Sequence, residues 1–322
     1  MKVIPQGGTN QQISGIHTVM GAGEWGLLFF LSLLWGGSFF FIGVAVRDLP
    51  PMVIVTLRVS LAALTLWCVV GAMRIPVPLS RASIMAFLGM GFLNNAIPFS
   101  LLVWGQSQIA SGLASILNAT TPFFTVIVAG VFLKDEKATR GKVLGVLIGL
   151  GGAVLIIGPG ALEGLGNHIW GQLACVAAGV SYAFAGVFGR RFKTMGIPPI
   201  LTATGQVTAS SLMLIPITLW WERPWELAPP QAGTWGAILA LGTVSTALAY
   251  IVYFRLLSRA GATNLLLVTL LIPVTAVWLG VVFLGEDLRG IHLAGMALIM
   301  VGLSTTDGRL WRYLGGKLGG GS

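Results

Sequence analysis

TPFFTVIVAGVFLKDE (121–136) and IPVTAVWLGVVFLGED (272–287) are two versions of one phrase, written 151 residues apart. Each version holds a proline, nine mostly apolar residues, Phe-Leu and then a pair of acids. Residues 134–142, at and after the end of the first version, include four basic residues. Residues 285–290, at and after the end of the second version, include one. A phrase repeated at this distance indicates two related halves, and the difference in charge bears on their orientation.

The composition of the chain is that of a membrane protein. Hydrophobic residues make up 55% of its 322 residues and charged residues only 9%, about a third of the charged fraction usual in soluble domains. Stretches apolar and long enough to cross a ~30 Å hydrocarbon core as helices occur ten times. They cover residues 25–46, 51–72, 82–104, 108–133, 141–158, 169–189, 198–220, 234–257, 261–284 and 290–306. These stretches are too long and too continuously apolar for barrel strands, so we predict an all-α integral membrane protein with ten transmembrane helices.

The basic residues between the spans predict how the chain is oriented. If the N-terminus is cytoplasmic, 15 of the 19 Lys and Arg residues fall in cytoplasmic segments, three fall outside, and one, Arg58, falls within a span. Basic residues gather on the cytoplasmic side of membrane proteins, so both termini are predicted to be cytoplasmic. This distribution explains the net charge of +9 without a nucleic-acid partner, and we expect none.

The repeat extends beyond the opening phrase, at offsets of 147 to 151 residues. The matches are Trp35-Gly36-Gly37-Ser38 with Tyr182-Ala183-Phe184-Ala185, Pro50-Pro51 with Pro198-Pro199, and Gly145 and Gly152 with Gly295 and Gly302. Because five is an odd number, a second five-helix half must enter the membrane from the opposite side, which explains the different charges after the two phrases. We therefore predict an inverted-topology repeat, in which a central site opens to either side in turn.

The repeat also predicts how the chain is divided. A mobile cytoplasmic tail (1–23) precedes the first five-helix repeat (24–158), and a linker (159–168) leads to the second repeat (169–306) and a cytoplasmic tail (307–322). The final residues, GGKLGGGS, have the composition of a cloning remnant. The first span is longer than a signal-peptide core and lacks a convincing cleavage site, so we expect it to be retained.

The two copies of the phrase, the Trp-Gly-Gly-Ser segment in span 1 and the glycine-rich spans 5 and 10 resemble the drug/metabolite transporter superfamily. The resemblance is to its ten-helix EamA-type members and covers residues 25–306. Within that family, the chain is most similar to YddG-type amino-acid exporters. The resemblance implies export of aromatic and other neutral amino acids from a central cavity across the bacterial inner membrane, with spans 5 and 10 at the periphery.

Arg58 is the one ionisable residue near the middle of a predicted span. A charge at that depth is costly unless it faces a cavity or finds polar partners. It is either an anchor for a substrate carboxylate or a structural arginine that hydrogen-bonds neighbouring helices or snorkels. Gln206 takes about the same place in the second half, where it would help to orient a zwitterion or would simply join helices.

Polar residues recur at helical spacing in several spans and so lie on faces turned away from lipid. The stripes are Ser111, Ser115, Asn118 and Pro122 in span 4, Thr243, Thr246, Tyr250 and Tyr253 in span 8, and Gln172, Cys175, Gly179, Tyr182 and Gly186 in span 6. Such stripes face a cavity or a neighbouring helix. Aromatic residues of spans 1 and 3 are candidate walls for an aromatic side chain. The candidate substrate-binding residues are Trp35, Ser38, Phe39, Arg58, Asn94, Asn95, Trp104, Ser115, Asn118, Tyr182, Gln206, Thr246 and Tyr250.

Prolines inside spans 3, 4 and 9 each free a backbone carbonyl and allow a kink. Pro98, Pro122 and Pro273 are therefore candidate hinges, and the alternative is that each kink only fits the bundle. Glycines recur every four residues in span 5, from Gly141 to Gly149, and predict close helix contact. That contact is either within the monomer or between subunits of a possible homo-oligomer.

Motifs of enzymes and metal sites are missing from the sequence. No H-E-x-x-H, G-x-S-x-G or Walker A pattern occurs, and Cys68 and Cys175 lack metal-ligand spacing, so we expect no catalytic residue, cofactor or metal. The sequence predicts a secondary transporter in the lipid bilayer that exports a small-molecule substrate, a neutral and especially an aromatic amino acid. The alternatives are an exporter of drug-like or other hydrophobic metabolites and, from other classes, an ion channel or a membrane-embedded enzyme.

Overall fold

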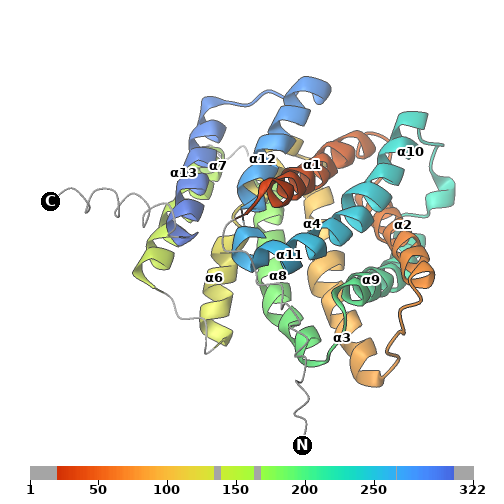
Figure 1. Ribbon diagram of the computed structural model, residues 1–322. Coiled ribbons are helices and arrows are strands. Elements are labelled where there is room, and N and C mark those ends of the chain that lie inside the picture. The colour runs from red at the N-terminus through yellow and green to blue at the C-terminus, as the bar shows by residue number, and fades with distance from the viewer. Residues whose placement is uncertain (1–19, 134–138, 163–167, 266, 308–322) are drawn as a thin grey trace, which may run out of the picture.

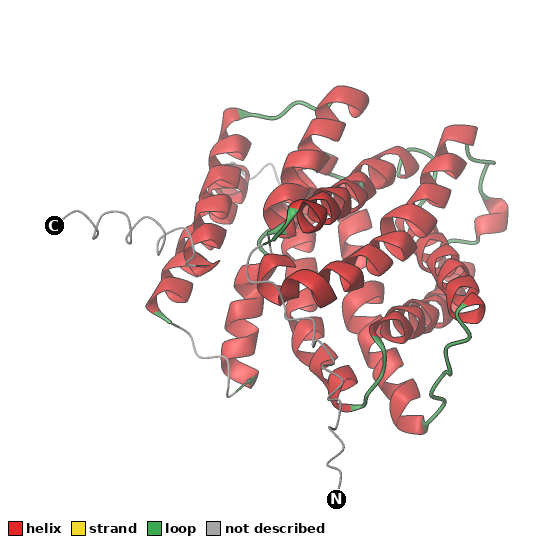
Figure 2. Cartoon of the chain, viewed as in Figure 1, coloured by secondary structure: helices red, strands yellow, loops and turns green. Residues whose placement is uncertain are grey.

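The computed structural model describes residues 20–133, 139–162, 168–265 and 267–307. Within these ranges the chain forms helices joined by turns and loops, without a strand (Figure 2). The predicted all-helical class is therefore confirmed. Seven helical segments in this part of the chain are long and apolar enough to cross a membrane, and two shorter apolar segments, Val268–Leu284 and Gly290–Thr306, follow them. The number of ten spans and the side on which the termini lie stay predictions.

The described elements follow the predicted spans in order. The first half holds α1 (Ala22–Ala45), α2 (Pro51–Ala72), α3 (Arg81–Gly91), the π-helical segment η1 (Phe92–Ala96), α4 (Ile97–Gln106), α5 (Ser111–Asn118), α6 (Thr121–Phe132) and α7 (Arg140–Leu162). The second half holds α8 (Ile169–Thr194), α9 (Pro199–Trp221), the 3-10 turn η2 (Pro224–Glu226), α10 (Ala232–Leu239), the π-helical segment η3 (Ala240–Leu248), α11 (Ala249–Leu265), α12 (Val268–Leu279), the π-helical segment η4 (Gly280–Leu284) and α13 (Gly290–Asp307). Predicted spans 3, 4, 8 and 9 thus each contain more than one helical element.

Prolines set several of these boundaries. Pro51 and Pro199 are the first residues of α2 and α9, where their fixed φ suits a helix and their missing N–H is not needed. Pro122 is the second residue of α6, which begins after a break that follows α5. Pro98 is the second residue of α4, directly after η1. Pro273 lies inside α12 without ending it. Whether the three prolines inside spans act as hinges stays a prediction.

The helices pack in pairs that correspond when the two halves are exchanged. α2 lies against α9 and α7 against α13, so spans at equivalent positions contact each other. α1 lies against α12, and correspondingly α8 lies against α6. Figure 1 shows α7 and α13 side by side at one edge of the bundle, opposite the edge formed by α2 and α9. This arrangement supports a two-fold relation between the halves.

Glycines allow α7 and α13 to approach closely. A Cβ atom on Gly145 would lie 2.6 Å from the carbonyl oxygen of Gly302, and a Cβ atom on Gly152 would lie 2.7 Å from the carbonyl oxygen of Gly295. Both distances are too short for a side chain, so the two backbones need glycine here. The sequence repeat matches Gly145 to Gly295 and Gly152 to Gly302, so these two contacts correspond to each other when the halves are exchanged.

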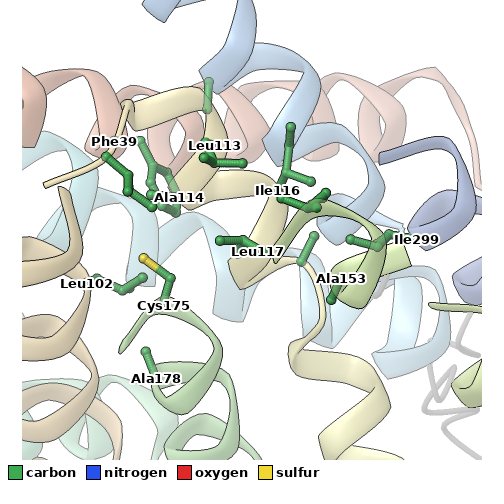
Figure 3. Close-up of a cluster of buried hydrophobic side chains, with 14 of the residues drawn as sticks. Phe39, Leu102, Leu113, Ala114, Ile116, Leu117, Ala153, Cys175, Ala178 and Ile299 are labelled. Carbon is green, nitrogen blue, oxygen red and sulfur yellow. The ribbon is translucent and has the colours of Figure 1, made fainter. Parts of the chain in front are cut away.

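The short helix α5 lies at the junction of the halves. Its Ala114, Ile116 and Leu117 are completely buried, and they belong to a cluster with side chains of α1, α4, α7, α8 and α13. Figure 3 shows α5 side chains facing Cys175 of α8 and Ile299 of α13. Apolar packing around α5 therefore joins elements of both halves.

We predict that Gly152→Ala destabilises the protein, because the new methyl group would meet the backbone of α13. Gly151→Ala is the matched control, since a Cβ atom there would have nothing within 4 Å, while both changes raise helix propensity equally. Thermal unfolding in detergent should show Gly152→Ala to be less stable than Gly151→Ala by about 1–3 kcal/mol, as for other overpacked sites. Equal unfolding temperatures for the two variants would contradict this account of the α7 and α13 contact.

Candidate functional site

A cavity of about 790 Å³ lies inside the bundle and is lined by residues of both halves. Its wall comes from α1 to α6 and η1 in the first half and from α8, α9, η3, α11 and α12 in the second. The lining reaches the protein surface at Lys193, Gly196 and Pro198, which are exposed at the C-terminal end of α8 and the turn after it. The cavity thus extends toward the end of the bundle that the sequence predicts to be cytoplasmic.

Most of the candidate residues lie in the wall of this one cavity. Those that line it are Trp35, Ser38, Phe39, Arg58, Asn94, Ser115, Asn118, Tyr182, Gln206, Thr246 and Tyr250. Of the candidate hinges, Pro273 lines it, whereas Pro98 and Pro122 do not. Binding of a substrate by these side chains stays a prediction.

Two candidate residues, Asn95 and Trp104, do not line the cavity, and a part for them in substrate binding stays a prediction. Asn95 is completely buried, and its Nδ2 donates to the Tyr250 hydroxyl at 3.0 Å. Trp104 is 41% exposed. Asn94 and Asn95 are neighbours in the chain, and neighbouring residues of a helix point to different faces, so only Asn94 lines the cavity.

The π-helical segment η3 shifts the predicted stripe of span 8, because a π-helical turn holds more residues than an α-helical turn. Thr243 does not line the cavity, and its hydroxyl donates to the carbonyl oxygen of Leu239 at 2.6 Å. Ser245 lines the cavity instead. The spacing of an ideal α-helix therefore identified Thr246 and Tyr250 but not Ser245.

Arg58 lies in the cavity wall and is only 4% exposed. Its Nε donates to the Thr246 hydroxyl at 2.9 Å, and its guanidinium carbon lies 3.7 Å from the centre of the Phe99 ring, a cation–π contact. Among the residues described here, no Asp or Glu lines the cavity. The positive charge of Arg58 therefore has a hydroxyl and a ring beside it but no acidic partner in the wall.

Gln206 and Asn94 form the counterpart of the Arg58–Thr246 pair. Asn94 Nδ2 donates to Gln206 Oε1 at 3.1 Å. Asn94 belongs to η1 of the first half, and its partner Gln206 belongs to α9, the second span of the second half. Thr246 belongs to η3 of the second half, and its partner Arg58 belongs to α2, the second span of the first half. The two pairs correspond when the halves are exchanged, but only one of them carries a charge.

Aromatic rings form a continuous part of the cavity wall. The Trp35 and Tyr253 ring centres are 5.6 Å apart, and the Tyr253 and Phe254 ring centres are 5.0 Å apart. Tyr250 stacks on Phe254 with 6.4 Å between ring centres. Phe254 and Phe99 were missed by the sequence analysis because an apolar ring in an apolar helix carries no signal of its own.

Two completely buried polar atoms of cavity-lining residues have no hydrogen-bond partner among the described residues. They are Asn118 Oδ1, in α5, and Ser245 Oγ, in η3. A buried polar group without a partner costs free energy, so such atoms are suited to a polar ligand or water.

Glu286, which follows the second copy of the phrase, holds the N-terminus of α5. Its carboxylate accepts hydrogen bonds from the backbone N–H groups of Ser111 at 2.6 Å and Gly112 at 2.9 Å. Gly280 makes room for it, because a Cβ atom there would collide with the carboxylate. A carboxylate at a helix N-terminus satisfies free N–H groups and complements the helix dipole. The contact therefore ties the end of span 9 to the start of span 4.

A second carboxylate, Asp48, holds the N-terminus of α10. It accepts hydrogen bonds from the Thr234 hydroxyl at 2.6 Å and from the Gln231 N–H at 3.0 Å, and these bonds lower the pKa of the Asp48 carboxyl. Asp48 precedes α2, while the cavity reaches the surface after α8, next to the start of α9. Both carboxylate contacts thus lie on connections away from the surface opening of the cavity.

Comparisons with known proteins agree on one family. The EamA-like transporter family matches residues 24–158 and again residues 169–306. The chain is 25% identical to the uncharacterized transporter YoaV of Bacillus subtilis, over 85% of this chain and 92% of that protein. It is 28% identical to the uncharacterized inner membrane transporter YedA of Escherichia coli K12, over 85% and 87% of the two chains.

A third relative, from Salmonella typhimurium, is named a probable amino-acid metabolite efflux pump. It is 29% identical over 85% of this chain and 92% of its own. A solved crystal structure, 19% identical, superposes with a TM-score of 0.64 over 89% of this chain and 98% of that one, which shows a shared fold. The matched family and these relatives are transporters rather than enzymes. Because the family matches most of the chain in two consecutive copies, this protein belongs to the EamA-like transporter family.

Proposed function

We propose that this transporter exports neutral, especially aromatic, amino acids across the bacterial inner membrane, as the likeness to YddG-type exporters implies. The observation that carries the proposal is Arg58, a buried guanidinium in the wall of the central cavity with no acid lining that cavity among the described residues. A guanidinium binds a carboxylate through two parallel hydrogen bonds, and the pair gains strength where water is excluded. A substrate carboxylate would supply the missing counter-charge.

The rest of the cavity complements the other parts of an aromatic amino acid. Asn118 Oδ1 and Gln206 Oε1 are acceptors suited to an ammonium group, and Asn118 Oδ1 has no partner of its own among the described residues. The rings of Trp35, Tyr253 and Phe254 offer a wall on which an aromatic side chain packs. The name of the Salmonella relative, an amino-acid metabolite efflux pump, lends support to this substrate class.

Alternating access between two inverted halves is the proposed mechanism. Three observations support it: the family matches each half, the helix contacts correspond when the halves are exchanged, and the cavity reaches the surface at one end. In this proposal the structure is the state open to the cytoplasm. The Glu286 contact with α5 then belongs to the closed outer side and must be released when the transporter opens outward.

We predict that purified protein in proteoliposomes takes up labelled phenylalanine with saturable kinetics, and that Arg58→Met lowers this uptake. Methionine keeps the apolar volume without leaving an unpaired buried charge, so the variant is expected to fold. Loss of a hydrogen-bonded ion pair to the substrate costs about 1.5–3 kcal/mol, which corresponds to roughly tenfold to a hundredfold weaker binding.

Two outcomes of that experiment would contradict the proposal at different points. Unchanged phenylalanine uptake by folded Arg58→Met would indicate that Arg58 has a structural role, and it would leave the proposal of amino-acid export standing. Folded wild-type protein without saturable uptake of phenylalanine, threonine or methionine would contradict amino-acid export. The apolar part of the cavity wall would then favour the alternative of a hydrophobic metabolite.

We further predict that Glu286→Gln increases the population of the state in which the cavity is open to the outer side. Glutamine keeps one acceptor oxygen but places an NH₂ group against the second backbone N–H, so one of the two bonds to α5 is lost. The measurement is labelling of Ser38→Cys, in protein without Cys68 and Cys175, by an impermeant maleimide added outside intact cells. Labelling should be faster with Glu286→Gln than without it, and Asp287→Asn, an exposed neighbouring acid, should have no effect. Equal labelling rates with and without Glu286→Gln would argue against a closing role for this contact.

A further inference from the structure

We propose that Tyr250 is a specificity-determining residue whose hydroxyl donates a hydrogen bond to the substrate carboxylate beside Arg58, and that Asn95 is the positioning residue that directs this hydroxyl. The inference rests on the proposed function, because it concerns the same cavity and the same substrate class.

The first step of the argument is the position of Tyr250 relative to Arg58. Tyr250 lies four residues after Thr246, whose hydroxyl accepts the hydrogen bond from Arg58 Nε at 2.9 Å. Thr246 lies in η3 and Tyr250 in α11, which follows η3 directly. Arg58, Thr246 and Tyr250 all line the cavity, so the Tyr250 side chain and the guanidinium belong to one wall.

The second step concerns the hydrogen bonds that the Tyr250 hydroxyl already makes. Its oxygen accepts from Asn95 Nδ2 at 3.0 Å and from Asn94 Nδ2 at 3.5 Å. A phenol has a single hydrogen to donate, and side-chain amide N–H groups are only donors. Because both asparagines donate to the oxygen, the hydrogen of Tyr250 must be donated elsewhere, and no described residue accepts it. The cavity that Tyr250 lines is where an acceptor can reach it.

The third step concerns the side-chain amide of Asn95. Asn95 is completely buried, and its Oδ1 has no hydrogen-bond partner among the described residues. It lies in the π-helical segment η1, a local structure that is frequent at functional sites. If the amide were rotated, its oxygen would accept the Tyr250 hydrogen and withdraw it from the cavity. The orientation of this one amide therefore decides where Tyr250 donates.

The consequence is that donors of two kinds, the guanidinium of Arg58 and the hydroxyl of Tyr250, belong to residues that line the same cavity. A carboxylate accepts from both, whereas a carboxamide has one acceptor oxygen and an NH₂ group that donates. This wall should therefore prefer an amino acid over its amide. The preference should be weaker without the Tyr250 hydroxyl.

Competition between phenylalanine and phenylalaninamide tests the inference. Labelled phenylalanine uptake into proteoliposomes gives the half-saturating concentration, and unlabelled phenylalaninamide gives an inhibition constant. With Tyr250→Phe, we expect the half-saturating concentration of phenylalanine to rise about tenfold, as for loss of a hydrogen bond to a charged group, while inhibition by the amide stays within twofold. Asn95→Asp should have the same effect, because its carboxylate accepts the Tyr250 hydrogen.

Thr243→Val is the matched control. Thr243 lies in the same span but does not line the cavity, and its hydroxyl donates to the backbone carbonyl of Leu239, so neither constant should change. A Tyr250→Phe transporter that keeps its phenylalanine constant within twofold overturns the inference and leaves the proposed function intact. An equal rise in the half-saturating concentration of phenylalanine and in the inhibition constant of phenylalaninamide also overturns the inference, because it would indicate a structural role for the Tyr250 hydroxyl. Wild-type protein without phenylalanine uptake overturns the function and the inference together.

Discussion

The positive charge of Arg58, buried in a bundle that is mostly apolar, is the constraint on which the organisation of the site depends. A guanidinium in such surroundings requires partners, because its transfer from water is costly. The protein supplies the Thr246 hydroxyl and the face of Phe99, and it leaves a cavity beside them rather than an acid. In the proposed function, the carboxylate of each substrate molecule neutralises the charge of Arg58 while the substrate is bound, and it dissociates when the substrate is released. A permanent acidic partner would make that exchange unfavourable.

The geometry of the site follows from how the two halves are packed. The glycine contacts of α7 with α13 and the pairing of α2 with α9 bring equivalent spans together. Between these pairs, the π-helical segments η1 and η3 each present polar groups to the second span of the other half. A symmetric scaffold thus holds two polar pairs with different charges, Arg58–Thr246 and Asn94–Gln206. This difference is what would orient a zwitterion in the cavity.

Sequence patterns predicted the parts of this structure that depend on composition and spacing. Apolar length predicted the helical class, the charge within a span pointed to Arg58, and the repeat pointed to Gln206; both residues line the cavity. Prediction from spacing failed where the backbone leaves the α-helical period, because η3 changes which side chains of span 8 face inward. Thr243 does not line the cavity for that reason, whereas Ser245 does. Apolar lining residues such as Phe99 were not identifiable, because lipid-facing and cavity-facing rings have the same sequence signature.

An experimental structure determined with bound L-phenylalanine would test the central claim most directly. The account predicts that the carboxylate lies within hydrogen-bond distance of the Arg58 guanidinium and that the phenyl ring lies against the wall formed by Trp35 and Tyr253. Phenylalanine bound with its carboxylate away from Arg58, or bound outside the cavity between the halves, would contradict the account.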